Sequence, residues 1–114
     1  MVKQTSYHKG IAAEDIVADY YKRLGYVLKE TRFKSAHGEI DLIFITQDTW
    51  VFVEVKCSKT HRAAAERILP RQVQRIYATA QGYLADMNND VDCRFDAALV
   101  DGIGRVEVIE NAFL

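Results

Sequence analysis

Hydrophobic residues recur at helical spacing in two stretches of the chain. Between residues 9 and 24 an apolar stripe precedes Gly25, which stands where a helix-ending glycine is common. A second stripe begins around Pro70, a residue suited to a first helical turn, and we expect Asn88–Asp90 to end it. The first stripe consists of Ala13, Ile16, Val17, Tyr20 and Leu24, and the second of Leu69, Val73, Ile76, Ala80, Leu84 and Met87. The sequence therefore predicts two amphipathic helices.

Five further stretches are rich in β-branched and aromatic residues and predict strands. Turns are expected at His37–Gly38, Gln47–Asp48 and Asp101–Gly104, and the polar, basic segment Ser58–Ile68 is expected to be a loop. The predicted strands are Tyr26–Phe33, Glu39–Thr46, Trp50–Cys57, Asp92–Val100 and Arg105–Ile109. The order α-β-β-β-α-β-β in a single domain (1–114) indicates an α/β fold, in which a mixed five-stranded central sheet is flanked by two helices, one on each face.

The hairpin predicted around Gln47–Asp48 carries its charged residues at the end away from the turn. Side chains alternate between the two faces of a strand, so the position of the turn fixes which residues face each other. In this register Asp41 faces Glu54 and Glu39 faces Lys56, with Cβ atoms about 4.5–5.5 Å apart on one face. The other face is wholly apolar and carries Ile40, Leu42, Phe44, Val51, Val53 and Val55.

Two facing carboxylates in strands this hydrophobic would be costly to bury, and a divalent cation between them would offset that cost. Mg²⁺ or Mn²⁺ takes oxygen ligands, commonly one or two carboxylates together with water and phosphate. We therefore predict Asp41 and Glu54 as metal ligands, with the carbonyl of Val55 as a third. Lys56 could orient or deprotonate a water, or neutralise charge developing on a phosphate. The alternative is a solvated sheet end with a Glu39–Lys56 ion pair.

Several motifs resemble the YraN-like family of small bacterial proteins, over about Gly10 to Phe113. They are Gly10-x-x-Ala13-Glu14, Gly38-Glu39-Ile40-Asp41-Leu42-Ile43, Phe52-Val53-Glu54-Val55-Lys56, Arg94-Phe95-Asp96 and Asn111-Ala112-Phe113. The resemblance implies a restriction-endonuclease-like fold, similar to archaeal Holliday-junction resolvases. It also implies that an acid on one strand and an E-x-K motif on the next bind the metal. These are Asp41, Glu54 and Lys56 here, with Glu14 as an additional acid and Gln72 as an accessory polar residue.

Composition and charge limit the expected cellular location and binding partners. The chain is 49% hydrophobic, and we identify neither a signal peptide nor a run of membrane-spanning length, so a cytoplasmic location without a membrane partner is expected. Cys57 and Cys93 are expected to be buried thiols. The net charge of −1 argues against a passive DNA-coating protein, but basic residues dominate from Lys56 to Arg75. Segments 58–67 and 32–37 are candidates for phosphate contacts, because they are basic and flank the predicted site.

The motifs and the resemblance together lead us to expect a Mg²⁺-dependent DNA endonuclease that hydrolyses phosphodiesters on branched or structured DNA. Action on a two-fold symmetric junction would require a homodimer. One alternative is a nucleic-acid-binding or protein-interaction module that retains the nuclease fold without turnover. A third reading is an unrelated α/β scaffold in which the polar cluster is only an ion-pair network.

Overall fold

The computed structural model of the chain describes residues 6–87 and 91–113. Its five strands form one sheet in the order β1-β2-β3-β4-β5, and every neighbouring pair is antiparallel except β3 with β4. The elements are α1 (Ser6–Arg23), β1 (Val27–Ser35), β2 (Gly38–Thr46), β3 (Thr49–Cys57), α2 (His61–Glu66), α3 (Pro70–Leu84), β4 (Asp92–Val100) and β5 (Val106–Ile109). The predicted mixed five-stranded sheet is confirmed.

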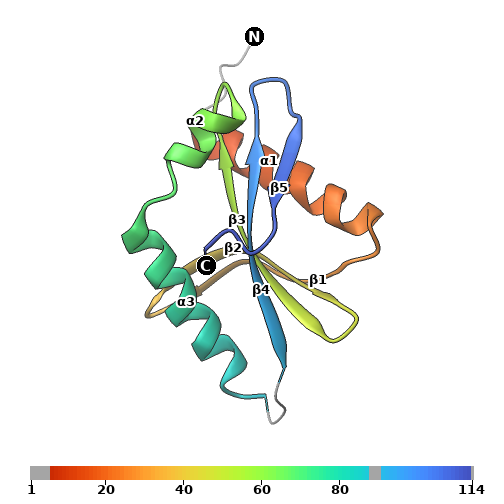
Figure 1. Cartoon of the computed structure of the whole chain (residues 1–114), viewed down its shortest axis with the longest axis vertical. Helices are drawn as coiled ribbons and strands as arrows, with labels where there is room; N and C mark the ends of the chain where they lie inside the picture. The colour runs from red at the N-terminus through yellow and green to blue at the C-terminus, as the bar shows by residue number, and fades with distance from the viewer. Residues whose placement is uncertain (1–5, 88–90, 114) are drawn as a thin grey trace.

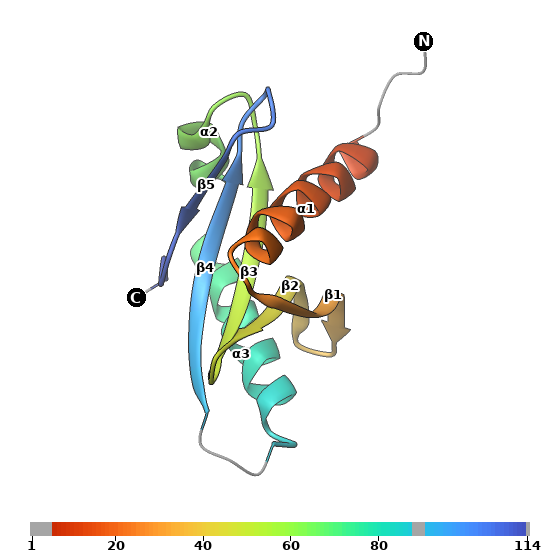
Figure 2. The same cartoon turned by 90° about the vertical axis from the view of Figure 1, so that its right-hand side faces the viewer.

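Helices α1 and α3 cover opposite faces of this strongly twisted sheet (Figure 1, Figure 2). The cluster under α1 includes Leu42, Phe44, Val51 and Val53, and the cluster under α3 includes Ile40, Ile43, Phe52, Ile76 and Ala80. Strands β2 and β3 are thus buried on both sides, as their composition predicted. The charged side chains of Asp41, Glu54 and Lys56 on these two strands therefore lie close to low-dielectric surroundings.

The prediction of a loop over Ser58–Ile68 is wrong, because this segment contains the six-residue helix α2. The side chain of Thr60 accepts a hydrogen bond from the Ala63 backbone N–H at 3.0 Å and caps the helix. Ala64 is fully buried and packs in the cluster that contains Leu99 of β4. Burial of this small side chain stabilises a helix that is too short to show a hydrophobic period.

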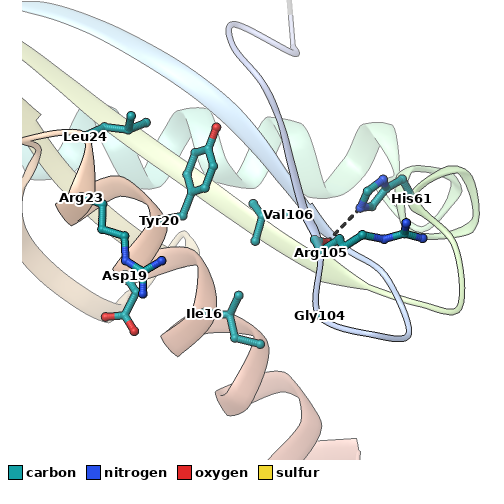
Figure 3. A pocket seen from close by; sticks show the side chains of 9 residues that line it. All are labelled: Ile16, Asp19, Tyr20, Arg23, Leu24, His61, Gly104, Arg105 and Val106. Atoms are coloured by element: carbon teal, nitrogen blue, oxygen red, sulfur yellow. Dashed lines mark hydrogen bonds between the residues drawn. The ribbon is translucent and has the colours of Figure 1, made fainter.

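The buried face of α1 also differs from the predicted stripe. Ala13 and Val17 are buried as expected, but Ile16, Tyr20 and Leu24 are 37–59% exposed. These three side chains line an open hollow of about 930 Å³ between α1 and the β4–β5 hairpin (Figure 3). The helix is rotated so that Ala13, Val17, Ala18 and Tyr21 meet the sheet, and the Tyr21 ring stacks on Phe44 with centroids 4.6 Å apart.

Helix α3 begins at Pro70 as predicted and ends at Leu84, so the expected continuation to Met87 is wrong. Leu69 is the N-terminal capping residue and is 53% exposed rather than packed. The proposed stop at Asn88–Asp90 lies outside the described residues. Gln72 lies in the first turn of α3, which points it toward the sheet.

Neither cysteine forms a disulfide in the structure. Cys57 is half-buried, but Cys93 is exposed, so the prediction of a buried thiol is wrong for Cys93. Its exposure follows from its place in the first two residues of β4, which are both exposed. Within residues 6–87 and 91–113, no helix is long and apolar enough to cross a membrane.

A buried polar network connects β4 to α1. Asp96 is fully buried and pairs with Arg94 at 2.9 Å, while the Tyr21 hydroxyl donates to Asp96 Oδ2 at 2.8 Å. The Arg94 guanidinium also donates to the Tyr26 hydroxyl at 2.8 Å. Arg94 and Asp96 of the Arg94-Phe95-Asp96 motif thus form a structural salt bridge.

Removing one partner of this pair is expected to destabilise the fold. Arg94→Ala would leave the Asp96 carboxylate buried without its cation, so we expect the free energy of unfolding to fall by about 3–5 kcal/mol. Urea denaturation measures this directly. Arg62→Ala removes a pair with Glu66 whose side chains are 91% and 69% exposed, and is expected to change stability by less than about 1 kcal/mol. Equal losses in the two variants would contradict the prediction.

Candidate functional site

The β2–β3 hairpin has the predicted turn and register near Gln47–Asp48. Ile45 pairs with Trp50 and Ile43 with Phe52, as expected, and the ladder ends at the pair Leu42–Val53. The two pairs that would bring together the charged residues lie beyond this end. The site therefore forms where β2 and β3 separate, not within a continuous ladder.

Asp41 occupies the point of separation. Its Oδ2 accepts a hydrogen bond from the Val55 backbone N–H at 2.7 Å, a donor that would face the Ile40 backbone if the ladder continued. The N–H and C=O of one residue point to the same side of a strand, so we infer that the Val55 carbonyl also faces Asp41. The Asp41 side chain thus replaces the backbone of β2 as the partner of Val55. The carboxylate of Asp41 and the carbonyl of Val55 therefore lie next to each other in the gap between the strands.

The strand alternation breaks at the same place. Ile40, predicted on the face of Leu42, instead packs in the cluster under α3. Arg32 lies on β1 between the residues that pair with Ile40 and Leu42, and has a φ of 52°. This left-handed conformation interrupts the extended backbone of β1 and allows the start of β2 to turn toward α3.

Glu39 does not join the site. Its carboxylate pairs with Lys34 on β1 at 3.5 Å, and both side chains are at least 60% exposed. The predicted facing pair Glu39–Lys56 is therefore wrong. Its geometric cause is the end of the ladder at Leu42, because β2 then follows β1 and leaves β3.

Glu54 is the centre of the polar cluster and is only 5% exposed. Its Oε1 lies 3.3 Å from Lys56 Nζ and accepts a hydrogen bond from Gln72 Nε2 at 3.1 Å. Each of the Asp41 and Glu54 carboxyl groups is within hydrogen-bonding reach of the other. The structure thus brings together the side chains of Asp41, Glu54, Lys56 and Gln72.

The electrostatics of this cluster favour neutralisation of one acid. Burial and the neighbouring Asp41 raise the pKa of Glu54 to about 8, against the lowering effect of Lys56. Burial also raises the pKa of Asp41, although the Val55 N–H acts in the opposite direction. At neutral pH the raised pKa of Glu54 favours its protonated form, and a metal ion could displace that proton.

Glu14 approaches the cluster from α1. It is half-buried at the edge of the packed face and lines a hollow of about 380 Å³ between α1 and β1–β2. Burial and then Asp41 raise the pKa of Glu14 to about 7, while Arg32 lowers it. Glu14 is therefore electrostatically linked to Asp41 from the opposite face to Gln72.

The donor set suits a magnesium-like cation better than zinc. Among the described residues, no group of three His, Cys, Asp or Glu side chains is arranged as a metal-binding cluster. Mg²⁺ commonly takes only one or two carboxylates, with water and phosphate completing its coordination. Asp41 and Glu54 fit this requirement because they are in contact, largely buried and incompletely neutralised by Lys56.

Sequence comparison relates the chain to proteins of matching length. A profile described as "Uncharacterised protein family UPF0102" matches residues 13–100. A UPF0102 protein of Cereibacter sphaeroides (strain ATCC 17025) is 45% identical over 115 residues, covering 99% of this chain and 98% of the relative. UPF0102 proteins of Ruegeria pomeroyi and Nitrosomonas europaea are 47% and 39% identical, covering 91% and 93% of this chain and 86% and 93% of each relative. The chain therefore belongs to the UPF0102 family, the YraN-like group that its motifs indicated.

Proposed function

We propose that this chain is a Mg²⁺- or Mn²⁺-dependent endonuclease that hydrolyses phosphodiester bonds in DNA, with a restriction-endonuclease-like fold. One observation carries the proposal. Two acids from neighbouring strands, Asp41 and Glu54, meet where the strands separate, with the Lys56 amine 3.3 Å from Glu54. In a purely structural ion-pair network, one acid would suffice to pair with Lys56. A second buried acid that the lysine does not fully neutralise would only add a desolvation cost.

The residues around the acid pair have distinct roles in this proposal. Bound by Asp41, Glu54 and the Val55 carbonyl, the metal ion would polarise a phosphate oxygen and lower the pKa of a water. Gln72 and Lys56 both contact Glu54 Oε1, so they orient the carboxylate that would help to hold the ion. The Lys56 amine would also neutralise charge that develops on the phosphate.

Glu14 has a different position and therefore a different role. It reaches the site from α1 and is coupled to Asp41 electrostatically, without belonging to a three-ligand cluster. A carboxyl group with a pKa of about 7 can accept or release a proton at neutral pH. We assign Glu14 to proton exchange with water near the ion.

A panel of DNA forms tests the proposal. Labelled single strands, linear duplexes, three-way and four-way junctions are incubated with the protein in Mg²⁺, in Mn²⁺ and in EDTA. We expect metal-dependent nicks, strongest on branched DNA, and on a four-way junction symmetric nicks would require two copies of the chain. DNA binding without cleavage of any form would favour the non-catalytic binding module.

The acid pair also predicts how stability depends on pH. Because the pKa of Glu54 is raised from 4.5 to about 8 in the folded protein, the folded state binds more protons than the unfolded state between these values. Without metal, the stability that this pair contributes is therefore lost as pH rises from 5 to 8, and the melting temperature should fall over this range. Mg²⁺ should raise the melting temperature at pH 8 and leave it almost unchanged at pH 5.

The variant Glu54→Gln separates this effect from other titrations. It removes the ionisable group but keeps an oxygen that can accept the Gln72 hydrogen bond. We expect a flatter pH profile and no stabilisation by Mg²⁺. A variant profile parallel to that of the wild type, or equal stabilisation by Mg²⁺ at both pH values, would contradict the assignment.

A further inference from the structure

The α3 side of the site carries three arginines whose charges are not matched by an acid. Arg67, Arg71 and Arg75 recur at every fourth residue across the junction of α2 and α3, and all three are exposed. We call them the arginine row. Within residues 6–87 and 91–113, none of the three pairs with a carboxylate.

Three other arginines of this chain pair with acids. These are Arg62 with Glu66, Arg94 with Asp96 and Arg105 with Asp101. The segment from Lys56 to Arg75 contains Glu66 as its only acid, and Glu66 is already paired with Arg62. The arginine row therefore adds uncompensated positive charge to one face of a protein whose formal net charge is −1.

Two contacts fix the ends of the arginine row beside the site. Arg67 Nη1 donates to the backbone oxygen of Cys57 at 2.7 Å, and Cys57 directly follows Lys56. At the other end Arg75 packs over Gly38, because a Cβ placed on Gly38 would lie 3.2 Å from the Arg75 Cβ. Gly38 begins β2, the strand that carries the first acid, and this start of β2 lies beside α3 (Figure 1).

The middle of the row is placed by Gln72. Gln72 donates to Glu54, and Arg71 is its neighbour in the first turn of α3. Arg71 and Arg75 lie one helical turn apart, with a rise of about 6 Å between them. The arginine row thus passes over the α3 side of the acid pair, from the end of β3 to the start of β2.

A guanidinium group presents a planar fork of N–H donors that matches the oxygens of a phosphate. Contacts of this kind position a nucleic acid by its backbone without reading its sequence. We propose that the arginine row binds the phosphate backbone of DNA and lays it across the α3 side of the Asp41–Glu54 site. This inference rests on the proposed function for the identity of the ligand, and it extends the expected phosphate contacts from 58–67 into α3.

Binding of fluorescently labelled duplex and four-way junction DNA in EDTA tests the inference without turnover. The double variant Arg71→Gln/Arg75→Gln keeps helix-forming side chains and removes two charges. We expect its Kd to rise by about tenfold or more at 100 mM salt. The slope of log K against log salt should become shallower by about 1.8, because each lost duplex phosphate contact contributes about 0.9.

The matched control is Lys22→Gln/Arg23→Gln, which removes two exposed charges from the last turn of α1 on the other face of the sheet. Its DNA affinity and salt slope should stay close to those of the wild type, and all variants should melt at similar temperatures. Equal losses in both variants, or none in the arginine-row variant, would overturn the proposal. A wild-type protein that does not bind DNA but binds polyglutamate would also overturn the proposal, because this result would indicate an acidic protein partner.

The two proposals fail separately in this design. If the wild type binds DNA through the arginine row but cleaves no DNA form in Mg²⁺ or Mn²⁺, the nuclease proposal is wrong and the row remains a DNA-binding surface. If the arginine-row variant binds and cleaves DNA as the wild type does, the phosphate-binding row is wrong and the nuclease proposal stands.

Discussion

Asp41→Asn is expected to abolish metal-dependent DNA cleavage, with a loss in rate of at least about 10³-fold. Asparagine keeps an oxygen that can accept the Val55 N–H, so the separation of β2 from β3 should survive the change. It removes the negative charge that Glu54 needs as a partner around a divalent ion. Single-turnover cleavage of the best DNA form at saturating Mg²⁺ measures the effect.

Glu39→Gln is the matched control, because Glu39 is the acid two residues earlier on the same strand. Its carboxylate is 60% exposed and paired with Lys34, so its influence on the site is weakened by solvent and the cleavage rate should change by less than about twofold. Glu54→Gln should behave like Asp41→Asn. Cleavage that persists in either of these two variants, or that fails equally in the Glu39 variant, would show that the acid pair does not hold the catalytic ion.

Lys56→Ala should reduce the cleavage rate by about 10²–10³-fold while metal binding is retained. The Lys56 amine contacts Glu54 but is itself a cation, so its loss removes charge stabilisation from the transition state and not a metal ligand. Mn²⁺ affinity should be unchanged or tighter, because one positive charge leaves the site. Cleavage rate and Mn²⁺ affinity are therefore measured on the same variant.

Two further variants define the role of Lys56. Lys56→Arg keeps the charge and should recover part of the lost rate. Lys22→Ala changes an exposed lysine in the last turn of α1 and should leave the rate within about twofold of the wild type. A Lys56→Ala variant that loses Mn²⁺ binding together with activity would mean that the lysine acts only by holding Glu54 in place.

The sequence alone was sufficient to predict the sheet and half of the hairpin register. The turn at Gln47–Asp48 fixed the pairs up to Leu42–Val53, because local turn geometry and alternation determine register in a hairpin. The sequence could not predict where the pairing of β2 with β3 ends. That end depends on Asp41 capturing a backbone donor and on β2 turning toward α3, both of which are tertiary effects.

The features missed on the α2–α3 side have a common cause. A six-residue helix is too short to show periodicity, although Thr60 three residues before Ala63 was a usable capping signal. Because α2 was not predicted, the spacing of Arg67 and Arg71 in the sequence could not indicate where these two side chains lie relative to each other. The exposure of Tyr20 was equally hidden, since the rotation of α1 is set by tertiary packing in which the neighbouring Tyr21 is buried against Phe44.

Calorimetric titration of Mn²⁺ at pH 8 into the wild type and into Asp41→Asn tests most directly whether the two acids share a cation. We expect the wild type to show saturable binding of one ion per chain and the variant to show no site of comparable affinity. Absence of Mn²⁺ binding by the wild type, or equal binding by the two proteins, would contradict a metal site between Asp41 and Glu54.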